Sequence, residues 1–187
     1  MSNTLALFWN LAATDREARI DASNELVSTL LQQSSDIGLV DDTKLMESPL
    51  SEQVTDDEMA GAEQRIDDAN TQDVSYAIRR LVRGLASPRE NARIGFAVAL
   101  SGLLTHLKTV SANDVLVLLL KYSVVRGNMN GQEVRDLQFA RLFGIYALVR
   151  SRLLYRASLS TFQRAFHILV QVASYKSWLS EPCGWVL

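Results

Sequence analysis

The sequence is poor in proline, glycine and cysteine, and each shortage excludes a class of structure. Its 187 residues include three Pro and nine Gly, which favours long helices over many short strands. Cys183 is the only cysteine, so no internal disulfide can form and we expect a reducing compartment. The longest apolar run, residues 115–120, is too short to cross a bilayer. No basic residue precedes the first apolar ones, so we expect neither a signal peptide nor a membrane partner.

Charge is distributed unevenly along the chain, although the net charge is only -2. Residues 33–72 contain eleven Asp or Glu and two basic residues, whereas residues 79–176 contain fifteen basic and four acidic residues. High charge with scattered apolar residues is typical of segments that do not fold alone. We therefore expect residues 33–72 to be a flexible acidic insert. Residues 56–69 could form a helix there, but we expect few contacts to hold it to the rest.

Three stretches share the pattern of a helix start. In each, a capping residue is followed three positions later by Glu, as in a capping box: Thr14 and Glu17, Ser87 and Glu90, and Asn130 and Glu133. An Arg follows each box, at Arg19, Arg93 and Arg135, with intervals of 74 and 42 residues. A period of about 40 to 47 residues with two helices per unit is the signature of HEAT-type repeats. The acidic insert accounts for the longer interval.

The repeat predicts an all-α, HEAT/armadillo-like helical-repeat solenoid segment with a long acidic loop after the first hairpin. Its parts are residues 1–32 as the first hairpin, 33–72 as the insert, and 73–187 as a continuing array truncated at its C-terminal end. The first helices of the pairs are expected at residues 4–13, 73–86 and 111–126, and a fourth pair opens with a cap at Ser160. Aromatic residues on the apolar stripes are expected in the core: Phe8, Trp9, Phe96, Phe139, Phe143 and Phe166.

Catalytic and metal-binding residues lack the spacing that such sites need. Two-metal catalysis requires paired carboxylates on a rigid element, and the adjacent pairs all fall in the acidic insert: Asp41 and Asp42, Asp56 and Asp57, and Asp67 and Asp68. His106 and His167 have no neighbouring Cys or His, as a zinc site would require, and Cys183 has no nearby base to activate it. We therefore predict no enzyme activity, cofactor, metal or small-molecule substrate.

Arginines provide the best functional lead. The candidates for an extended cationic surface are Arg79, Arg80, Arg83, Arg141, Arg150, Arg152 and Arg156. Arg141 and Arg152 are eleven residues apart, or three helical turns, so we expect these two to align. Such a surface would meet nucleic-acid phosphates or an acidic protein, and the acidic insert could cover it when no partner is present. The alternative is an ordinary solvated face whose Arg stems cover apolar surface. Arg19, Arg93 and Arg135 are expected to pair with carboxylates or helix C-terminal carbonyls between neighbouring hairpins.

Four stretches together resemble one known family. They read LFWNLAATDREARIDASNELV at residues 7–27, YAIRRLVRGLASPRENARIGFAVALSGLL at 76–104, EVRDLQFARLFGIYALVRSRLL at 133–154, and KSWLSEPCGWVL at 176–187. They are similar to the N-terminal region of the DNA polymerase V (also called phi) and Myb-binding protein 1A family. The resemblance covers nearly the whole chain outside the acidic insert.

The resemblance implies a nuclear, nucleolar protein of ribosome biogenesis, tied to ribosomal RNA transcription and its regulation. The leading interpretation is a non-enzymatic scaffold that binds nucleolar proteins through solenoid surfaces. The first alternative is a DNA- or RNA-binding module that holds rDNA or rRNA along the basic face. A DNA polymerase is a third class, which the family name invites but no catalytic residues support. Affinity that falls steeply with salt would distinguish the nucleic-acid binder from the scaffold.

Overall fold

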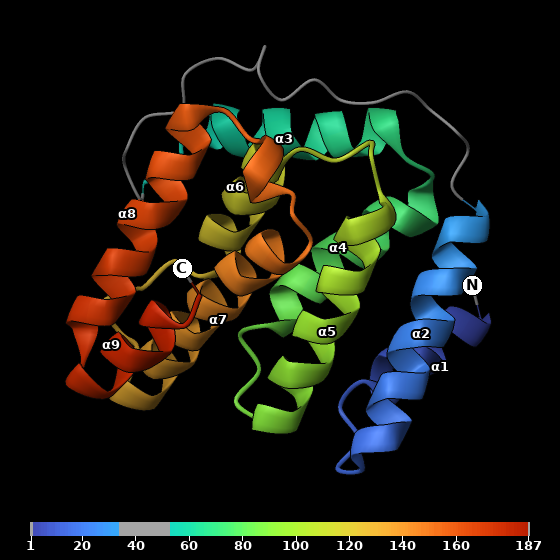
Figure 1. Ribbon diagram of the computed structural model, residues 1–187, viewed down its shortest axis with the longest axis horizontal. Coiled ribbons are helices and arrows are strands. Elements are labelled where there is room, and N and C mark those ends of the chain that lie inside the picture. Colours follow the sequence, from blue (N-terminus) through green and yellow to red (C-terminus); the bar gives the residue numbers. More distant parts are fainter. Residues whose placement is uncertain (1, 34–52, 187) are drawn as a thin grey trace.

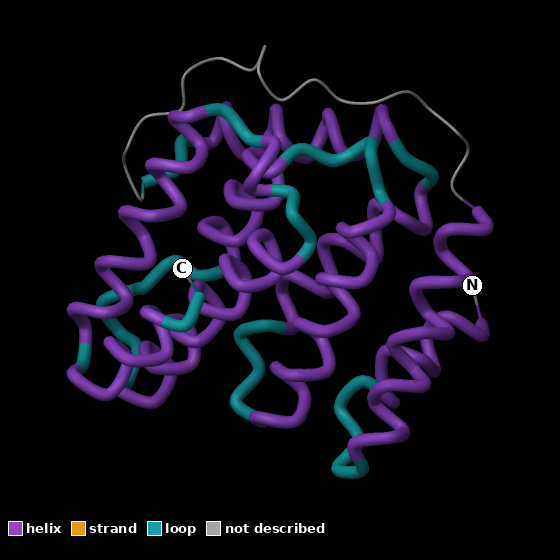
Figure 2. Tube along the Cα trace, viewed as in Figure 1, coloured by secondary structure: helices purple, strands orange, loops and turns teal. Residues whose placement is uncertain are grey.

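The computed structural model describes residues 2–33 and 53–186, and every regular element in these ranges is a helix (Figure 2). The helices are α1 (Ser2–Asn10), α2 (Arg16–Gln33), α3 (Asp56–Ala69), α4 (Gln72–Gly84), α5 (Glu90–His106), α6 (Ala112–Tyr122), α7 (Gly131–Arg150), the 3-10 helix η2 (Leu154–Arg156), α8 (Leu159–Tyr175) and α9 (Ser177–Gly184). The all-α prediction is confirmed. The expected first helices of the pairs are present as α1, α4 and α6, with ends shifted by a few residues.

Apart from α3, the helices pack as consecutive pairs. Helix α1 packs on α2, α4 on α5, α6 on α7, and α8 on α9. The pairs follow one another across the molecule in chain order (Figure 1). In one layer α5 contacts both α2 and α7, and in the other α6 contacts both α4 and α8. Each pair therefore buries its apolar faces against the next pair along the chain.

Helix α6 lies at the centre of this arrangement and is apolar on all sides from Val115 to Leu120. Every residue from 112 to 120 is buried, because α3, α4, α7 and α8 all pack against α6. A helix surrounded in this way has no polar face to show. The apolar run at residues 115–120 is thus a buried core helix. In the described part of the chain, no helix is both long and apolar enough to cross a membrane.

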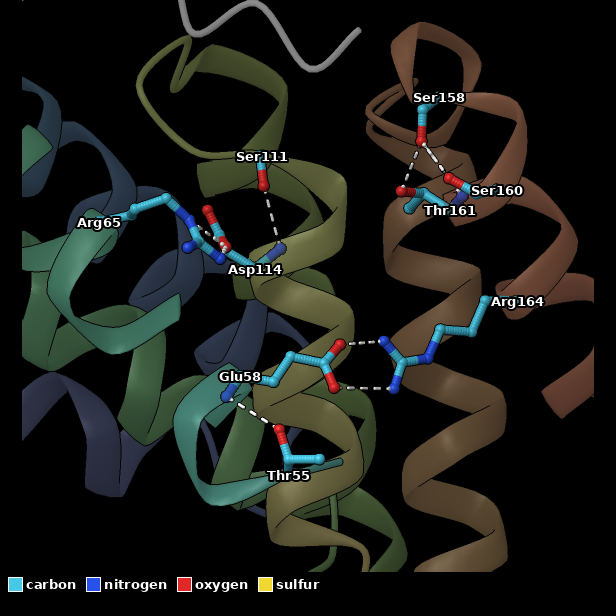
Figure 3. Close-up of polar contacts among 9 residues, drawn as sticks. All are labelled: Thr55, Glu58, Arg65, Ser111, Asp114, Ser158, Ser160, Thr161 and Arg164. Carbon is cyan, nitrogen blue, oxygen red and sulfur yellow. Dashed lines mark hydrogen bonds and ion pairs between the residues drawn. The ribbon is translucent and has the colours of Figure 1, made fainter. Parts of the chain in front are cut away.

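Helix α3 lies across the ends of the other helices (Figure 1), and ion pairs fasten it there. Glu58 pairs with Arg164 of α8 (Figure 3), and Glu63 accepts a 2.7 Å hydrogen bond from Lys121 of α6. Arg65 donates through Nε to Asp114 of α6 at 2.9 Å (Figure 3). Asp67 also pairs with Arg79 of α4 at 2.8 Å. We call these contacts the α3 clamp.

The clamp corrects the prediction that few contacts hold residues 56–69. The helix forms, with Thr55 as its cap, and buries Ala62 and Ile66. The many carboxylates of this segment led us to expect a solvated region. Their partners lie 12 to 106 residues away in the chain, so no local sequence pattern could reveal these ion pairs. Residues 34–52, which include most of the predicted insert before α3, lie outside the described residues.

Two of the three predicted capping boxes are wrong. Asn130 and Glu133 do form the box at the start of α7. At α2, however, Asp15 replaces Thr14 as the cap and accepts from the Ala18 amide at 2.7 Å, because a carboxylate interacts more favourably with the positive end of a helix. At α8 the cap is Ser158, two residues before the expected Ser160 (Figure 3).

Ser87 shapes the turn before α5 and does not cap the helix. Its hydroxyl accepts from the Arg89 amide at 3.3 Å, and α5 begins only at Glu90. The Ser87 carbonyl accepts a 2.8 Å hydrogen bond from Arg93. The predicted box between Ser87 and Glu90 is therefore absent, because both polar groups of Ser87 are engaged before the helix begins.

Two of the three repeated arginines, Arg19 and Arg93, hold the turns that precede the second helices. Arg19 donates to the Ala13 carbonyl at 2.8 Å, six residues back, and Arg93 does the same to Ser87. Arg93 also reaches Asp136 of α7 at 3.3 Å. Burial lowers the pKa of the Arg93 guanidinium, while the Asp136 carboxylate acts in the opposite direction. Arg135 lies 3.7 Å from Asp136 and is more exposed.

The clamp makes a prediction about stability. Arg164 is fully buried, so Glu58→Ala would remove the carboxylate that pairs with a buried guanidinium and lower the free energy of unfolding by about 3 kcal/mol. Asp57→Ala, which removes an exposed carboxylate of the same helical turn, should cost less than about 1 kcal/mol. Urea denaturation followed by circular dichroism measures both.

A double variant separates loss of the pair from loss of packing. Glu58→Leu combined with Arg164→Met replaces both charges by apolar groups and should recover most of the stability lost in Glu58→Ala. If Glu58→Ala and Asp57→Ala unfold at the same urea concentration, the clamp does not stabilise the fold.

Candidate nucleic-acid interface

A groove along α4 contains three of the predicted arginines. The apolar stripe of this helix is buried as expected, at Val74, Ile78, Leu81 and Leu85, which places Arg79, Arg80 and Arg83 away from the core. Together with side chains of α5 and α6, they line a groove of about 560 Å³. Its lining residues are Tyr76, Arg79, Arg80, Arg83, Gly84, Ala86, Ser87, Phe96 and Tyr122.

Aromatic rings, not carboxylates, hold two of these guanidinium groups. The Arg80 carbon Cζ lies 4.6 Å from the centre of the Phe8 ring, and its Nη1 donates to the Tyr76 hydroxyl at 2.6 Å. Arg83 lies over the ring of Tyr122 at 4.8 Å. Stacking of this kind orients a guanidinium group while its positive charge persists. Arg80 and Arg83 can therefore present N–H donors to a phosphate.

Arg79 differs because the clamp already engages it. Its Nη1 donates to Asp67 of α3 at 2.8 Å, so a carboxylate neutralises its charge. The acidic helix thus contacts the basic groove at one edge. A phosphate that approached Arg79 would compete with Asp67 for the same donor.

Close packing of α4 on α5 shapes the groove floor. A Cβ atom on Gly84 would lie 2.4 Å from the Phe96 ring, which is closer than nonbonded atoms approach. Glycine at this position therefore lets the ring lie flat against α4. Phe96 and Tyr122 come from other helices, so no spacing within the α4 sequence indicated them. Only Tyr76 and Arg80, four residues apart on one helix face, carried a local signal.

The other predicted arginines do not extend this groove into a continuous face. Arg141 is buried, and its guanidinium donates to the hydroxyl and carbonyl oxygens of Ser123 at 3.2 Å. The eleven-residue spacing would place Arg141 and Arg152 on one helix face only if a single helix continued through both positions. Helix α7 ends at Arg150, and Arg152 has a φ of 60°, so the helical register stops between them. The prediction that Arg141 and Arg152 align is wrong.

Arg150, Arg152 and Arg156 form a second exposed cluster, at the end of α7 and in η2. Arg152 lines a different, apolar cleft. Two of the aromatic residues expected in the core are also exposed, namely Trp9 and Phe166. An apolar stripe predicts that a residue packs inward, but these two lie on helix faces that the described part of the chain leaves uncovered.

Asp67, Asp68 and Cys183, which we considered for catalysis on sequence grounds, have contacts that are typical of structural residues. Asp67 pairs with Arg79, and Asp68 accepts from Gln64 at 2.7 Å, while Asp41 and Asp42 lie outside the described residues. No group of three or more His, Cys, Asp or Glu in residues 2–33 and 53–186 could hold a metal ion. Burial raises the pKa of the Cys183 thiol, which disfavours the reactive thiolate form.

Comparison with known proteins places the chain in a family. Residues 76–187 match the model of the DNA polymerase phi family. The chain is 42% identical to the rDNA transcriptional regulator pol5 of Schizosaccharomyces pombe over 132 residues, which cover 69% of this chain and 14% of that protein. It is 26% identical to the rDNA transcriptional regulator POL5 of Saccharomyces cerevisiae over 205 residues, covering 97% of this chain and 17% of that protein.

A more distant match is Myb-binding protein 1A of Rattus norvegicus, 28% identical over 148 residues that cover 79% of this chain and 8% of that protein. No solved structure matches the chain. The chain spans less than a fifth of the length of each of these relatives. The family match covers more than half of the chain and agrees with the curated relatives, so this protein belongs to the DNA polymerase phi family.

Proposed function

We propose that this chain is a non-enzymatic scaffold in rDNA transcription, and that it works in the nucleolus through the surfaces of a HEAT/armadillo-like array. The observation that supports this most directly is the packing of consecutive helical pairs, each against the next. Arrays of this kind offer extended surfaces and hold their partners there. The relatives named rDNA transcriptional regulators support the same setting.

The carboxylates support a scaffold more than a polymerase. Two-metal catalysis needs carboxylates that converge on open space. Glu58, Glu63 and Asp67 instead each pair with a cation on a neighbouring helix. These side chains fasten α3 to the array, which is an architectural role.

Nucleic-acid binding is the second candidate, and the α4 groove favours it. Three arginines and the rings of Tyr76, Phe96 and Tyr122 line the same groove. Proteins that bind single strands combine cationic grooves with aromatic side chains on which bases stack. In this interpretation Arg80 and Arg83 contact phosphates, and the exposed Tyr76 ring meets a base.

A salt titration tests this second candidate. We expect fluorescent single-stranded RNA to bind at low salt, with log affinity falling against log salt with a slope of roughly −1.4, as two single-strand phosphate contacts would give. Changing Arg79, Arg80 and Arg83 together to Ala should weaken binding at least about tenfold and flatten the slope. Structured RNA and duplex DNA serve as comparison probes.

The matched control changes Arg150, Arg152 and Arg156 to Ala, which removes the same charge from the second cluster. Equal losses in both triple variants would mean that only net charge matters and that the α4 groove is not a site. Absence of binding at low salt would assign the groove to protein partners and leave the scaffold proposal standing. Thermal melting checks that each variant is folded.

The pairing of Asp67 with Arg79 predicts that α3 restrains the groove. Asp67→Asn should raise affinity for single-stranded RNA a few-fold at low salt, because Arg79 no longer has a competing carboxylate. The increase should vanish in an Arg79→Ala background, as a double-mutant cycle requires for a direct interaction. Asp68→Asn is the matched control, since Asp68 bonds to Gln64 instead. An equal increase in both variants would show that the effect is one of net charge.

A further inference from the structure

An apolar cleft opens between α7, η2 and α8, apart from the α4 groove. Its walls include Val149 of α7, Leu154 and Tyr155 of η2, and Phe162 and Phe166 of α8. The cleft measures about 530 Å³, enough to take several aliphatic side chains. None of its lining residues lines the α4 groove. The two are therefore independent surfaces.

Helix α8 carries a second apolar stripe that faces this region. Its inner stripe is buried and includes Ala165, Ile168 and Val172. A different set of apolar residues follows helical spacing along the exposed side: Leu159, Phe162, Phe166 and Val170. Leu159 is 72% exposed, and Tyr155, which lines the cleft, is 91% exposed. A contiguous set of large exposed apolar side chains marks an interaction site, whereas isolated ones need no explanation.

Positive charge lies beside the cleft in the sequence. Residues 137–180 contain no Asp or Glu, and the next carboxylate along the chain is Glu181 of α9. Arg152 lines the cleft, and Arg150 and Arg156, two and four residues away in the sequence, are also exposed. We call these three residues the arginine rim. An occupant of the cleft thus meets apolar walls and the Arg152 guanidinium.

We propose that this cleft docks an acidic amphipathic helix of a protein partner. Apolar residues of that helix, spaced three and four apart, would fill the space between Val149, Tyr155 and Phe162. Carboxylates on its flanks would meet Arg150, Arg152 and Arg156, which fixes its orientation and favours it over a basic helix. This surface goes beyond the nucleic-acid groove, and its test does not depend on the outcome of the salt titration.

The test is a fluorescence-polarisation titration with a designed peptide. The probe is a fluorescein-labelled helix of about 18 residues, or five turns, with Leu at spacings of three and four and Glu on the remaining faces. We expect saturable binding to this peptide. A scrambled peptide of the same composition should not bind, and a peptide with Lys in place of Glu should bind at least about tenfold more weakly.

Two sets of variants locate the binding. Phe162→Ala combined with Phe166→Ala should weaken the acidic peptide at least about tenfold, while Trp9→Ala, an exposed aromatic residue on α1, should leave it unchanged. Arg150→Gln combined with Arg156→Gln should weaken binding and reduce its salt dependence. The arginine pair lies on the surface, so it tests the proposal even if the phenylalanine pair unfolds.

Other occupants give different results. If the protein dimerises in sedimentation equilibrium and the phenylalanine pair abolishes the dimer, the occupant is a second copy of this chain and the proposal is wrong. If the scrambled and amphipathic peptides bind equally, or if both sets of variants leave peptide binding intact, the cleft is not a helix-docking site. If single-stranded RNA competes with the peptide for the cleft, the arginine rim serves nucleic acid instead.

Discussion

The ion pair between Glu58 and the buried Arg164 is the interaction on which the arrangement of the helices depends most. A guanidinium that is fully buried requires a partner, because an unpaired charge in the core is very costly. Glu58 supplies a carboxylate partner from α3 (Figure 3). The other clamp pairs fasten the same helix to α4 and α6. An acidic segment thereby ties three successive helical pairs together. It also holds α4 and α8 in place, and these helices carry the two candidate surfaces.

Arginine residues have two roles in this protein: the buried ones hold neighbouring elements together, and those at the surface are available to a partner. Arg93, Arg141 and Arg164 are buried and bind carbonyl, hydroxyl or carboxylate oxygens of neighbouring elements. Arg80 and Arg83 lie over aromatic rings at the edge of a groove, where the guanidinium groups still present donors. The excess of basic residues between positions 79 and 176 therefore overstates the charge available to a partner. Of the exposed basic residues in this range, Arg83 lines the α4 groove and Arg152 lines the cleft by α8, whereas Arg89, Lys108, Arg126 and Lys176 line neither.

The two surfaces fit a scaffold better than they fit an enzyme. The α4 groove combines arginines with rings and suits a phosphate-bearing chain, whereas the cleft by α8 is apolar with a cationic rim and suits a helix. Both lie on helices that are fixed by their neighbours, as binding sites on repeat proteins generally are. Our proposal is that one array brings a nucleic acid and a protein together, and the relatives named for rDNA transcription support that setting.

Local chemistry in the sequence determined the all-helical fold, the positions of the first helices of the pairs and the cap at Asn130, because these depend on residues within one or two helical turns of each other. The four-residue spacing of Tyr76 and Arg80 likewise placed both residues on one face of α4. Tertiary structure alone decided that α3 docks, that Arg141 is buried, and that Phe96 and Tyr122 join the groove. Those outcomes depend on contacts such as Arg65 with Asp114, 49 residues apart, and Glu58 with Arg164, 106 residues apart. A pattern read along the chain carries no information about which distant side chain will face a given residue, so only packing could pair them.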